Sequence, residues 1–258
     1  MKTVLITGAS EGIGYELSQL FANAHYQLIL VARNEQKLNA MCETYTSNGI
    51  KCTYFVADLS IMSHVERLAD KIDQLPFKID YLINNAGFGI YGNSTELDWE
   101  KESAMYQLNM ISLAYLTKHF SIQMTKNGFG RILNVASIAA FQPLPFMAGY
   151  AASKAFVLSL SQALNEELKK QNVYVSTLCP GVTESKFHNT ANTEKKTLGS
   201  FLFPCCHSTR SCSVWVQTTY VRQKHRHIWL AKSHSNWLVT IYPSCIYCEN
   251  CWDNDEIN

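Results

Sequence analysis

The chain contains 258 residues with a formal net charge of +1, and 47% of its residues are hydrophobic. This length suits one large α/β domain or two small ones, and the near-neutral charge without a Lys/Arg block excludes a nucleic-acid partner or a polybasic membrane anchor. The sequence contains no apolar run of about 18 residues, and the apolar stretch near its start breaks at Gly8, so we expect no membrane partner, no signal peptide and a cytoplasmic location.

The first elements of the chain predict a dinucleotide-binding unit. Residues 3–7 (TVLIT) are apolar and mostly β-branched, as in a strand buried on both faces, and residues 15–24 have the pattern of an amphipathic helix. The loop between them is rich in glycine, which lets a backbone turn tightly and approach a pyrophosphate at the helix N-terminus. A plain strand-to-helix turn is the alternative. The candidate contacts in this loop are Gly8, Ser10, Gly12, Ile13 and Gly14.

A second strand over residues 27–33 ends at Arg33, and this residue bears on the choice of cofactor. NAD-binding folds commonly place an acidic residue here to hold the ribose 2′-hydroxyl, whereas an arginine suits a 2′-phosphate. We therefore predict NADP rather than NAD. Glu11 argues against this choice, because its carboxylate in the glycine loop could lie near that phosphate. A solvated charge at the strand end is the alternative for Arg33.

The rhythm of strand and helix continues along the chain. Helical patterns over residues 34–47 and 61–75 alternate with strand patterns over residues 51–60 and 79–87. Such alternation is typical of parallel sheets with helices on both faces. We therefore predict an α/β fold: a single-domain, Rossmann-like, doubly wound parallel sheet.

Two of these strands end in residues suited to a cofactor crevice. Asp58 follows the third strand, where it would either accept a hydrogen bond from an adenine amino group or cap the next helix. The fourth strand ends in the sequence NNAG, at the edge where such sheets bind their ligands; a simple turn is the alternative. The candidate contacts in this segment are Asn85, Ala86 and Gly87.

The middle of the chain carries the candidate catalytic residues. A long helix over residues 98–126 contains Asn109 among apolar neighbours, and a strand over residues 130–137 delivers Ser137. Tyr150 and Lys154 are four residues apart at the start of a further helix, so the ammonium can lie close to the phenol and favour the phenolate. Ser137 could hydrogen-bond a substrate oxygen. Taken alone, the Tyr-x-x-x-Lys spacing also occurs by chance.

Together these motifs resemble the short-chain dehydrogenase/reductase family over about the first 190 residues. TGASEGIG, NNAG, YAASK and PGVT appear in the order and approximate spacing of that family, and the closest resemblance is to bacterial-type oxidoreductases of unassigned substrate. The resemblance implies hydride transfer between a nicotinamide and a small-molecule carbonyl or alcohol substrate. It also implies a homodimer or homotetramer. A catalytically inactive dinucleotide-binding protein is the alternative.

The resemblance also implies a role for each matching residue. Tyr150 would be the general acid/base, and Lys154 would lower its pKa and bond the nicotinamide ribose. Ser137 would orient the substrate oxygen, while Asn109 would hold a water that links Lys154 to solvent. The turn after the last matching strand would complete the cofactor site through Pro180, Gly181 and Thr183, the last at the nicotinamide carboxamide.

The end of the chain departs from the family pattern. From residue 200 onward there is no Gly, and six of the nine Cys and four of the five Trp lie there. We therefore expect a dinucleotide-binding domain over residues 1–198 and an atypical tail over residues 199–258, which we interpret as read in a shifted frame. A genuine, divergent C-terminal segment is the alternative. Loss of the usual last strand and substrate-covering segment would impair activity and favour aggregation.

The tail also contains the spacing of a metal site. Cys245, Cys248 and Cys251 form C-x-x-C-x-x-C with histidines nearby in sequence, a set of ligands that suits zinc or an iron–sulfur cluster. A frame-shifted stretch rich in Cys and His gives the same pattern by accident, so we predict no metal site.

Overall fold

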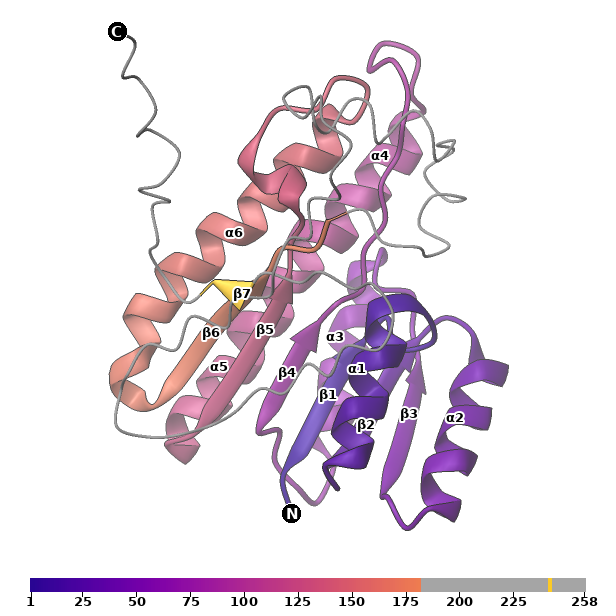
Figure 1. Ribbon diagram of the computed structural model, residues 1–258, viewed down its shortest axis with the longest axis vertical. Coiled ribbons are helices and arrows are strands. Elements are labelled where there is room, and N and C mark those ends of the chain that lie inside the picture. The colour runs from indigo at the N-terminus through magenta and orange to yellow at the C-terminus, as the bar shows by residue number, and fades with distance from the viewer. Residues whose placement is uncertain (182–240, 243–258) are drawn as a thin grey trace, which may run out of the picture.

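The structure is a computed structural model, which describes residues 1–181 and the two-residue strand Ile241–Tyr242. In this part of the chain, strands and helices alternate to form one sheet with helices on both faces (Figure 1). The strands are β1 (Thr3–Thr7), β2 (Gln27–Ala32), β3 (Cys52–Val56), β4 (Tyr81–Asn84), β5 (Gly130–Val135), β6 (Val173–Leu178) and β7 (Ile241–Tyr242). The α-helices are α1 (Gly12–Asn23), α2 (Glu35–Ser47), α3 (Met62–Asp73), α4 (Trp99–Tyr106), α5 (Leu113–Asn127) and α6 (Ala148–Leu168).

The sheet has the order β3-β2-β1-β4-β5-β6-β7. The first six strands are parallel, and β7 pairs antiparallel with β6. The chain first builds outward from β1 to β3 and then returns to build from β4 to β6 on the other side. This reversal between β1 and β4 creates a crevice at the carboxyl ends of the strands, where doubly wound sheets bind ligands. The predicted fold class is confirmed.

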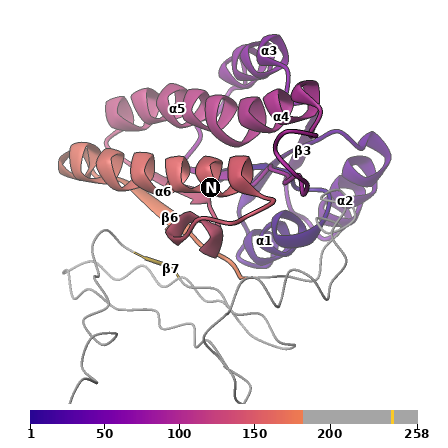
Figure 2. The same ribbon diagram turned by 90° about the horizontal axis from the view of Figure 1, so that it is seen from above.

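Alternate residues of each strand explain the two layers of helices. Val4 and Ile6 face a core shared with α1 and α2, whereas Leu5 faces a core shared with α3, α5 and α6. Figure 2 shows these two groups of helices on opposite sides of the sheet. Because both faces are covered, every residue of β1, β2 and β4 is buried, and the sequence predicted this burial for β1.

The helix predicted over residues 98–126 is interrupted. The segment Gln107–Ser112 is π-helical and joins α4 to α5, so one long helical path continues with a local insertion. Insertions of this kind are frequent at functional sites. Asn109 lies in this segment, and its side chain is completely buried.

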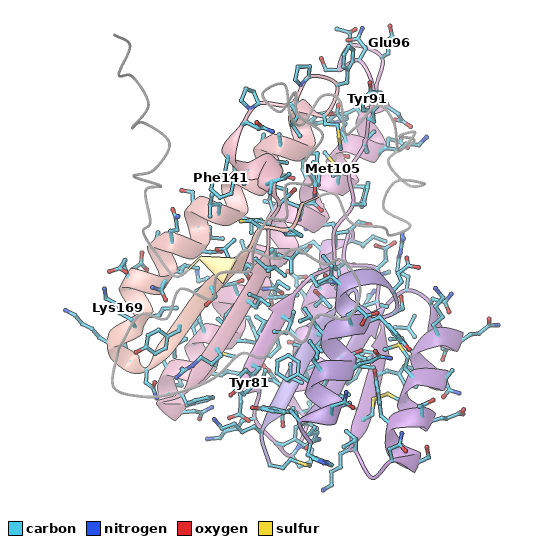
Figure 3. The ribbon with its side chains drawn as sticks, in the orientation of Figure 1. Tyr81, Tyr91, Glu96, Met105, Phe141 and Lys169 are labelled. Carbon is cyan, nitrogen blue, oxygen red and sulfur yellow. A yellow bond between two sulfur atoms is a disulfide. The ribbon has the colours of Figure 1, made fainter. Side chains whose placement is uncertain are left out.

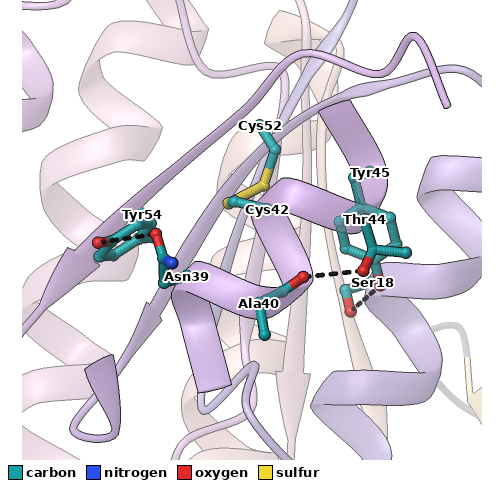
Figure 4. Close-up of a disulfide and its surroundings, with 8 residues drawn as sticks. All are labelled: Ser18, Asn39, Ala40, Cys42, Thr44, Tyr45, Cys52 and Tyr54. Atoms are coloured by element: carbon teal, nitrogen blue, oxygen red, sulfur yellow. Dashed lines mark hydrogen bonds between the residues drawn. A yellow bond between two sulfur atoms is a disulfide. The ribbon is translucent and has the colours of Figure 1, made fainter. Parts of the chain in front are cut away.

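A disulfide that the sequence did not predict joins Cys42 of α2 to Cys52 of β3 (Figure 4). Close to it, the Tyr45 hydroxyl and the Ser18 Oγ are 3.1 Å apart, which links α2 to α1. These bonds fasten α2 to both of its neighbours. Among the described residues, Cys179 is the free cysteine, and it is buried.

Several predictions lie outside the described residues: the role of Thr183, the nature of residues 199–258 apart from β7, and the absence of a metal site at Cys245, Cys248 and Cys251. Within the described part, no group of three or more His, Cys, Asp or Glu side chains could hold a metal ion. A search of the same residues finds no helix with the length and apolar character needed to span a bilayer.

Candidate functional site

A cleft of about 530 Å³ opens at the carboxyl ends of the strands and runs from the end of β2 to the start of α6. Figure 3 shows Tyr91, Met105 and Phe141 toward this end of the sheet, with Tyr81 at the opposite end. Most residues predicted from the sequence line the cleft: Gly8, Ser10, Gly12, Ile13, Arg33, Asp58, Asn85, Ala86, Gly87, Ser137, Tyr150, Lys154, Pro180 and Gly181. Gly14 and Asn109 lie behind the cleft wall and support it.

The glycine loop is held against the loop after β4. Asn85 donates from Nδ2 to the carbonyl oxygens of Thr7 and Gly8, at 3.1 and 3.0 Å. Gly8 has a φ of +65°, and a Cβ on Gly14 would lie 2.2 Å from the Gly8 oxygen. Only glycine fits at these two positions, so the motif reflects the close packing of the two loops.

The start of α1 provides a place for an anion. Its N-terminal cap residue, Glu11, makes no side-chain capping bond, and the first turn of the helix contains no acidic residue. Backbone N–H groups at a helix N-terminus favour phosphate groups. The glycine loop, the length of the cleft and this helix end together fit a nicotinamide dinucleotide.

At the far end of the cleft, Arg33 and Asp58 follow the neighbouring strands β2 and β3. The Arg33 Nη1 and Asp58 Oδ2 are 4.0 Å apart, and the arginine side chain is 75% exposed. Burial acts to raise the pKa of Asp58, but hydrogen bonds from Ser60 and the charge of Arg33 outweigh it, so the pKa lies below its ordinary value. Asp58 accepts from the backbone N–H of Ser60 at 2.9 Å and does not cap α3, whose cap residue is Ile61. The capping alternative is therefore wrong.

Both polar atoms of the Asn109 side chain have local hydrogen-bond partners. Its Oδ1 accepts from the N–H of Phe88 at 3.2 Å, and its Nδ2 donates to the Phe88 oxygen at 2.9 Å and to the Ser153 Oγ at 3.1 Å. Ser153 in turn donates to the carbonyl oxygen of Tyr150 at 2.7 Å. The amide thus joins the loop after β4 to the first turn of α6.

Ser137 and Tyr150 meet at the inner end of the cleft. Ser137 hydrogen-bonds the phenol of Tyr150. Burial raises the pKa of that phenol to about 12, and the bond from Ser137 partly offsets this shift. The Ser137 Oγ also accepts from the N–H of Ala139 at 3.2 Å, which fixes the hydroxyl at the start of a 3₁₀ turn over Ile138–Phe141.

Lys154 lies one turn along α6 from Tyr150, as the spacing predicted. Its Nζ donates to the carbonyl oxygen of Val135 at 2.9 Å and is 5.8 Å from the centre of the Tyr150 ring. Burial lowers the pKa of Lys154 to about 8. A Cβ added to Gly87 would lie 3.0 Å from the Asn109 Oδ1 and 3.4 Å from the Lys154 Nζ, so the amide and the ammonium border the same small space. The lowering of the Tyr150 pKa by Lys154 stays a prediction.

The substrate end of the cleft has apolar walls. Two segments with apolar sequences, Ile90–Asn93 and Ala139–Met147, are candidates for these walls. Ala139, Leu144 and Met147 do line this end of the cleft, together with Phe88. The segment Ile90–Asn93 is not part of the lining, because Ile90 and Tyr91 pack behind it against the cluster around Met105.

Three polar residues of the cleft were missed by sequence reasoning: Asn34, Lys37 and Ser60. Asn34 caps α2 by accepting from the N–H of Lys37 at 2.9 Å, and Lys37 forms an ion pair with Glu11 at 3.1 Å. An Asn directly after a strand and before a helix is itself a capping signal, and Lys37 lies in the first turn that follows. The pairing with Glu11 has no signal in the sequence.

The sequence of this chain matches the family model described as short chain dehydrogenase over residues 2–196. The ketoacyl reductase HetN of Nostoc sp. is 31% identical over 180 residues, which cover 70% of this chain and 63% of HetN. The chain therefore spans less than two thirds of that relative's length.

Solved structures of similar proteins share the fold. A short-chain dehydrogenase from Sphingobium yanoikuyae in complex with NADPH is 33% identical, with a TM-score of 0.73 and 77% of each chain covered. The bulky-bulky ketone specific alcohol dehydrogenase from Comamonas testosteroni is 31% identical, with a TM-score of 0.68 over 71% of this chain and 74% of that one.

Proposed function

This chain belongs to the short-chain dehydrogenase family. We propose that it is an NAD(P)-dependent oxidoreductase of a small-molecule substrate, that it prefers NADP, and that it acts on a hydrophobic carbonyl compound or the matching alcohol. The observation that carries this proposal is the cleft itself, which has Tyr150, Ser137 and Lys154 at one end and Arg33 at the other. The structural relative from Sphingobium yanoikuyae was solved with NADPH, which supports the choice of cofactor.

In this proposal Tyr150 is the group that moves the proton. The bound nicotinamide supplies or accepts the hydride, and the chain's own residues handle the substrate oxygen. In the direction of reduction, the Tyr150 hydroxyl gives its proton to that oxygen while Ser137 holds it by a hydrogen bond. A phenol with a pKa raised by burial keeps its proton at neutral pH, as an acid must before it acts.

Lys154 and Asn109 act behind the phenol. The ammonium of Lys154 is a positive charge one turn from Tyr150, which would stabilise the phenolate that remains after proton transfer. Asn109 borders the same space near Gly87, where a water bonded to its Oδ1 would connect Lys154 to solvent. The complete set of these four residues favours an enzyme over the alternative of a dinucleotide-binding protein without turnover.

The substrate class rests on the lining of the cleft near Tyr150. Phe88, Leu144 and Met147 offer apolar side chains there, and none of them carries a charge. The name of the Comamonas testosteroni relative describes it as specific for bulky-bulky ketones, which supports a ketone with two large apolar substituents. HetN is named a ketoacyl reductase, so a 3-ketoacyl ester belongs in the same substrate panel.

We also propose that residues 1–198 carry the cofactor and catalytic residues and that residues 199–258 form an atypical, shifted-frame tail that impairs substrate closure. The family match ends at residue 196, which supports this boundary. A cytoplasmic location and a homodimer or homotetramer remain predictions.

The test is a pair of titrations followed by a substrate panel. Cofactor fluorescence should report tighter binding of NADPH than of NADH to the full chain, and aryl and branched alkyl ketones should support NADPH oxidation faster than short aliphatic aldehydes. Equal binding of both cofactors would reject the NADP preference, and a faster reaction with small polar carbonyls would reject the substrate class. A chain that ends at Leu198 tests the role of the tail. Turnover by this shorter chain that equals or exceeds that of the full chain would support the proposal that the tail impairs activity.

A further inference from the structure

The mouth of the cleft contains an ion pair between two segments that are far apart in the sequence. Glu11 lies in the glycine loop and Lys37 in the first turn of α2, and the Lys37 Nζ is 3.1 Å from the Glu11 Oε2. Both residues line the cleft together with Arg33. The Glu11 side chain is 52% exposed and the Lys37 side chain is 40% exposed, so either group can turn toward a ligand in the cleft.

The position of Lys37 suits a second contact to the phosphate proposed for Arg33. Arg33 and Asn34 directly precede α2, and Asn34 bonds the backbone N–H of Lys37, which fixes the first turn of the helix. Arg33 and Lys37 therefore flank the cap residue Asn34, and both cations lie at the N-terminal end of α2. Two cations at this end of the cleft match the double negative charge of a 2′-phosphate.

Glu11 is the residue of this site that opposes phosphate binding. A carboxylate beside a phosphate repels it, yet here the carboxylate is already neutralised by Lys37. Exposed ion pairs contribute little to stability, so little free energy opposes their exchange for a stronger partner. A phosphate dianion is such a partner, because it carries up to about twice the negative charge of a carboxylate.

We propose that Lys37 is a specificity-determining residue for the cofactor, which exchanges the Glu11 carboxylate for the 2′-phosphate when NADP binds. This inference rests on the NADP preference proposed above and adds a residue to it. With NAD there is no phosphate to receive Lys37, so the pair with Glu11 stays closed. Glu11 accordingly moderates the affinity for NADP and leaves that for NAD unchanged.

The test measures binding to the full chain and does not depend on turnover. Dissociation constants for NADPH and NADH are obtained by fluorescence, and those for adenosine 2′,5′-bisphosphate and AMP by calorimetry, because the last two differ only in the 2′-phosphate. Lys37→Met should weaken NADPH and the bisphosphate about tenfold, the loss expected for one charge-assisted contact, and leave NADH and AMP unchanged. Glu11→Gln should tighten the two phosphorylated ligands by about two- to fivefold, as expected when an exposed pair and a repulsion are removed.

Matched controls lie outside the lining of the cleft. Lys51→Met removes a lysine at the opposite end of β3, and Glu43→Gln neutralises a carboxylate further along α2; neither should change any of the four constants. A Lys37→Met variant that weakens AMP as much as the bisphosphate, or that weakens neither, would overturn the proposal. So would a Glu11→Gln variant that binds NADPH more weakly than the wild type.

The design separates this inference from the proposal beneath it. If the wild type binds NADH as tightly as NADPH, the NADP preference fails and the inference fails with it. If the wild type prefers NADPH and Lys37→Met keeps that preference while Arg33→Ala loses it, the preference stands and only the role of Lys37 is rejected. Thermal unfolding of each variant beside the wild type shows whether a lost affinity reflects a lost fold.

Discussion

The ammonium of Lys154 donates to the carbonyl oxygen of Val135 at 2.9 Å, across a separation of 19 residues. This bond joins α6 to the carboxyl end of β5 directly below Tyr150. It also holds a cation at a position shielded from bulk solvent, since Lys154 is only 5% exposed. The cost of that burial should be measurable in the stability of the protein.

Lys154→Met should change the pH dependence of unfolding. Burial lowers the pKa of Lys154 from 10.5 to about 8, so between these values the unfolded chain holds more protons than the folded one. The free energy of unfolding of the wild type should therefore rise by up to about 3 kcal/mol from pH 8 toward pH 10.5, and it should lack this rise below pH 8. Urea unfolding of the wild type and of Lys154→Met across this pH range measures the difference. Free energies of unfolding that change with pH in the same way in both proteins would contradict the prediction.

Gly14→Ala should disrupt the glycine loop. The added Cβ would lie 2.2 Å from the Gly8 oxygen, and a backbone atom has little freedom to move away. We expect a loss of at least about 3 kcal/mol in stability, together with loss of cofactor binding. Gly128→Ala is the control: its φ of +69° costs about 1 kcal/mol, but no atom lies within 4 Å of the new Cβ. Similar melting temperatures for the two variants would show that the loop tolerates a side chain.

Arg33→Ala should weaken NADPH binding about tenfold and leave NADH binding unchanged, because the guanidinium would contact only the 2′-phosphate. The side chain is 75% exposed and its carboxylate neighbour is 4.0 Å away, so the substitution should not lower stability. Fluorescence titration with both cofactors measures the effect. An equal loss for NADPH and NADH would place Arg33 outside the phosphate site.

The disulfide between Cys42 and Cys52 should stabilise the folded chain. It closes a loop of 10 residues, for which chain entropy predicts about 2–3 kcal/mol. A reductant should lower the melting temperature of the wild type and have no effect on a Cys42→Ser/Cys52→Ser variant.

The disulfide also bears on where the protein is located. Disulfides are rare in the cytosol, so this bond argues against the expected cytoplasmic location. Peptide mapping of protein alkylated inside intact cells would decide: free thiols at both positions would contradict the disulfide.

Much of the fold could be predicted from local patterns. The apolar runs that became β1, β2 and β4 are buried along their whole length, and the four-residue spacing of Tyr150 and Lys154 placed both on the inner face of α6. Such features depend on one element at a time. The order of the motifs then indicated the family, which the comparisons confirmed.

The remaining features depend on contacts between elements. Asn109 binds Phe88, 21 residues upstream, so its partners follow from how the π-helical segment packs on the loop after β4. That segment left no trace in the sequence because its residues continue an ordinary helical pattern. The pairs Glu11–Lys37 and Cys42–Cys52 likewise arise only when α2 lies against its neighbours.

The central claim, that this chain transfers hydride with Tyr150 as its proton carrier, is tested most directly by Tyr150→Phe. This change removes one oxygen and leaves the ring in its place, so the fold and the affinity for NADPH should be kept. The account predicts that oxidation of NADPH by an apolar ketone falls at least about a hundredfold, within the range expected for loss of a general acid. Turnover by the Tyr150→Phe variant at the wild-type rate would contradict this account. A wild type that binds NADPH tightly but shows no turnover would contradict it as well.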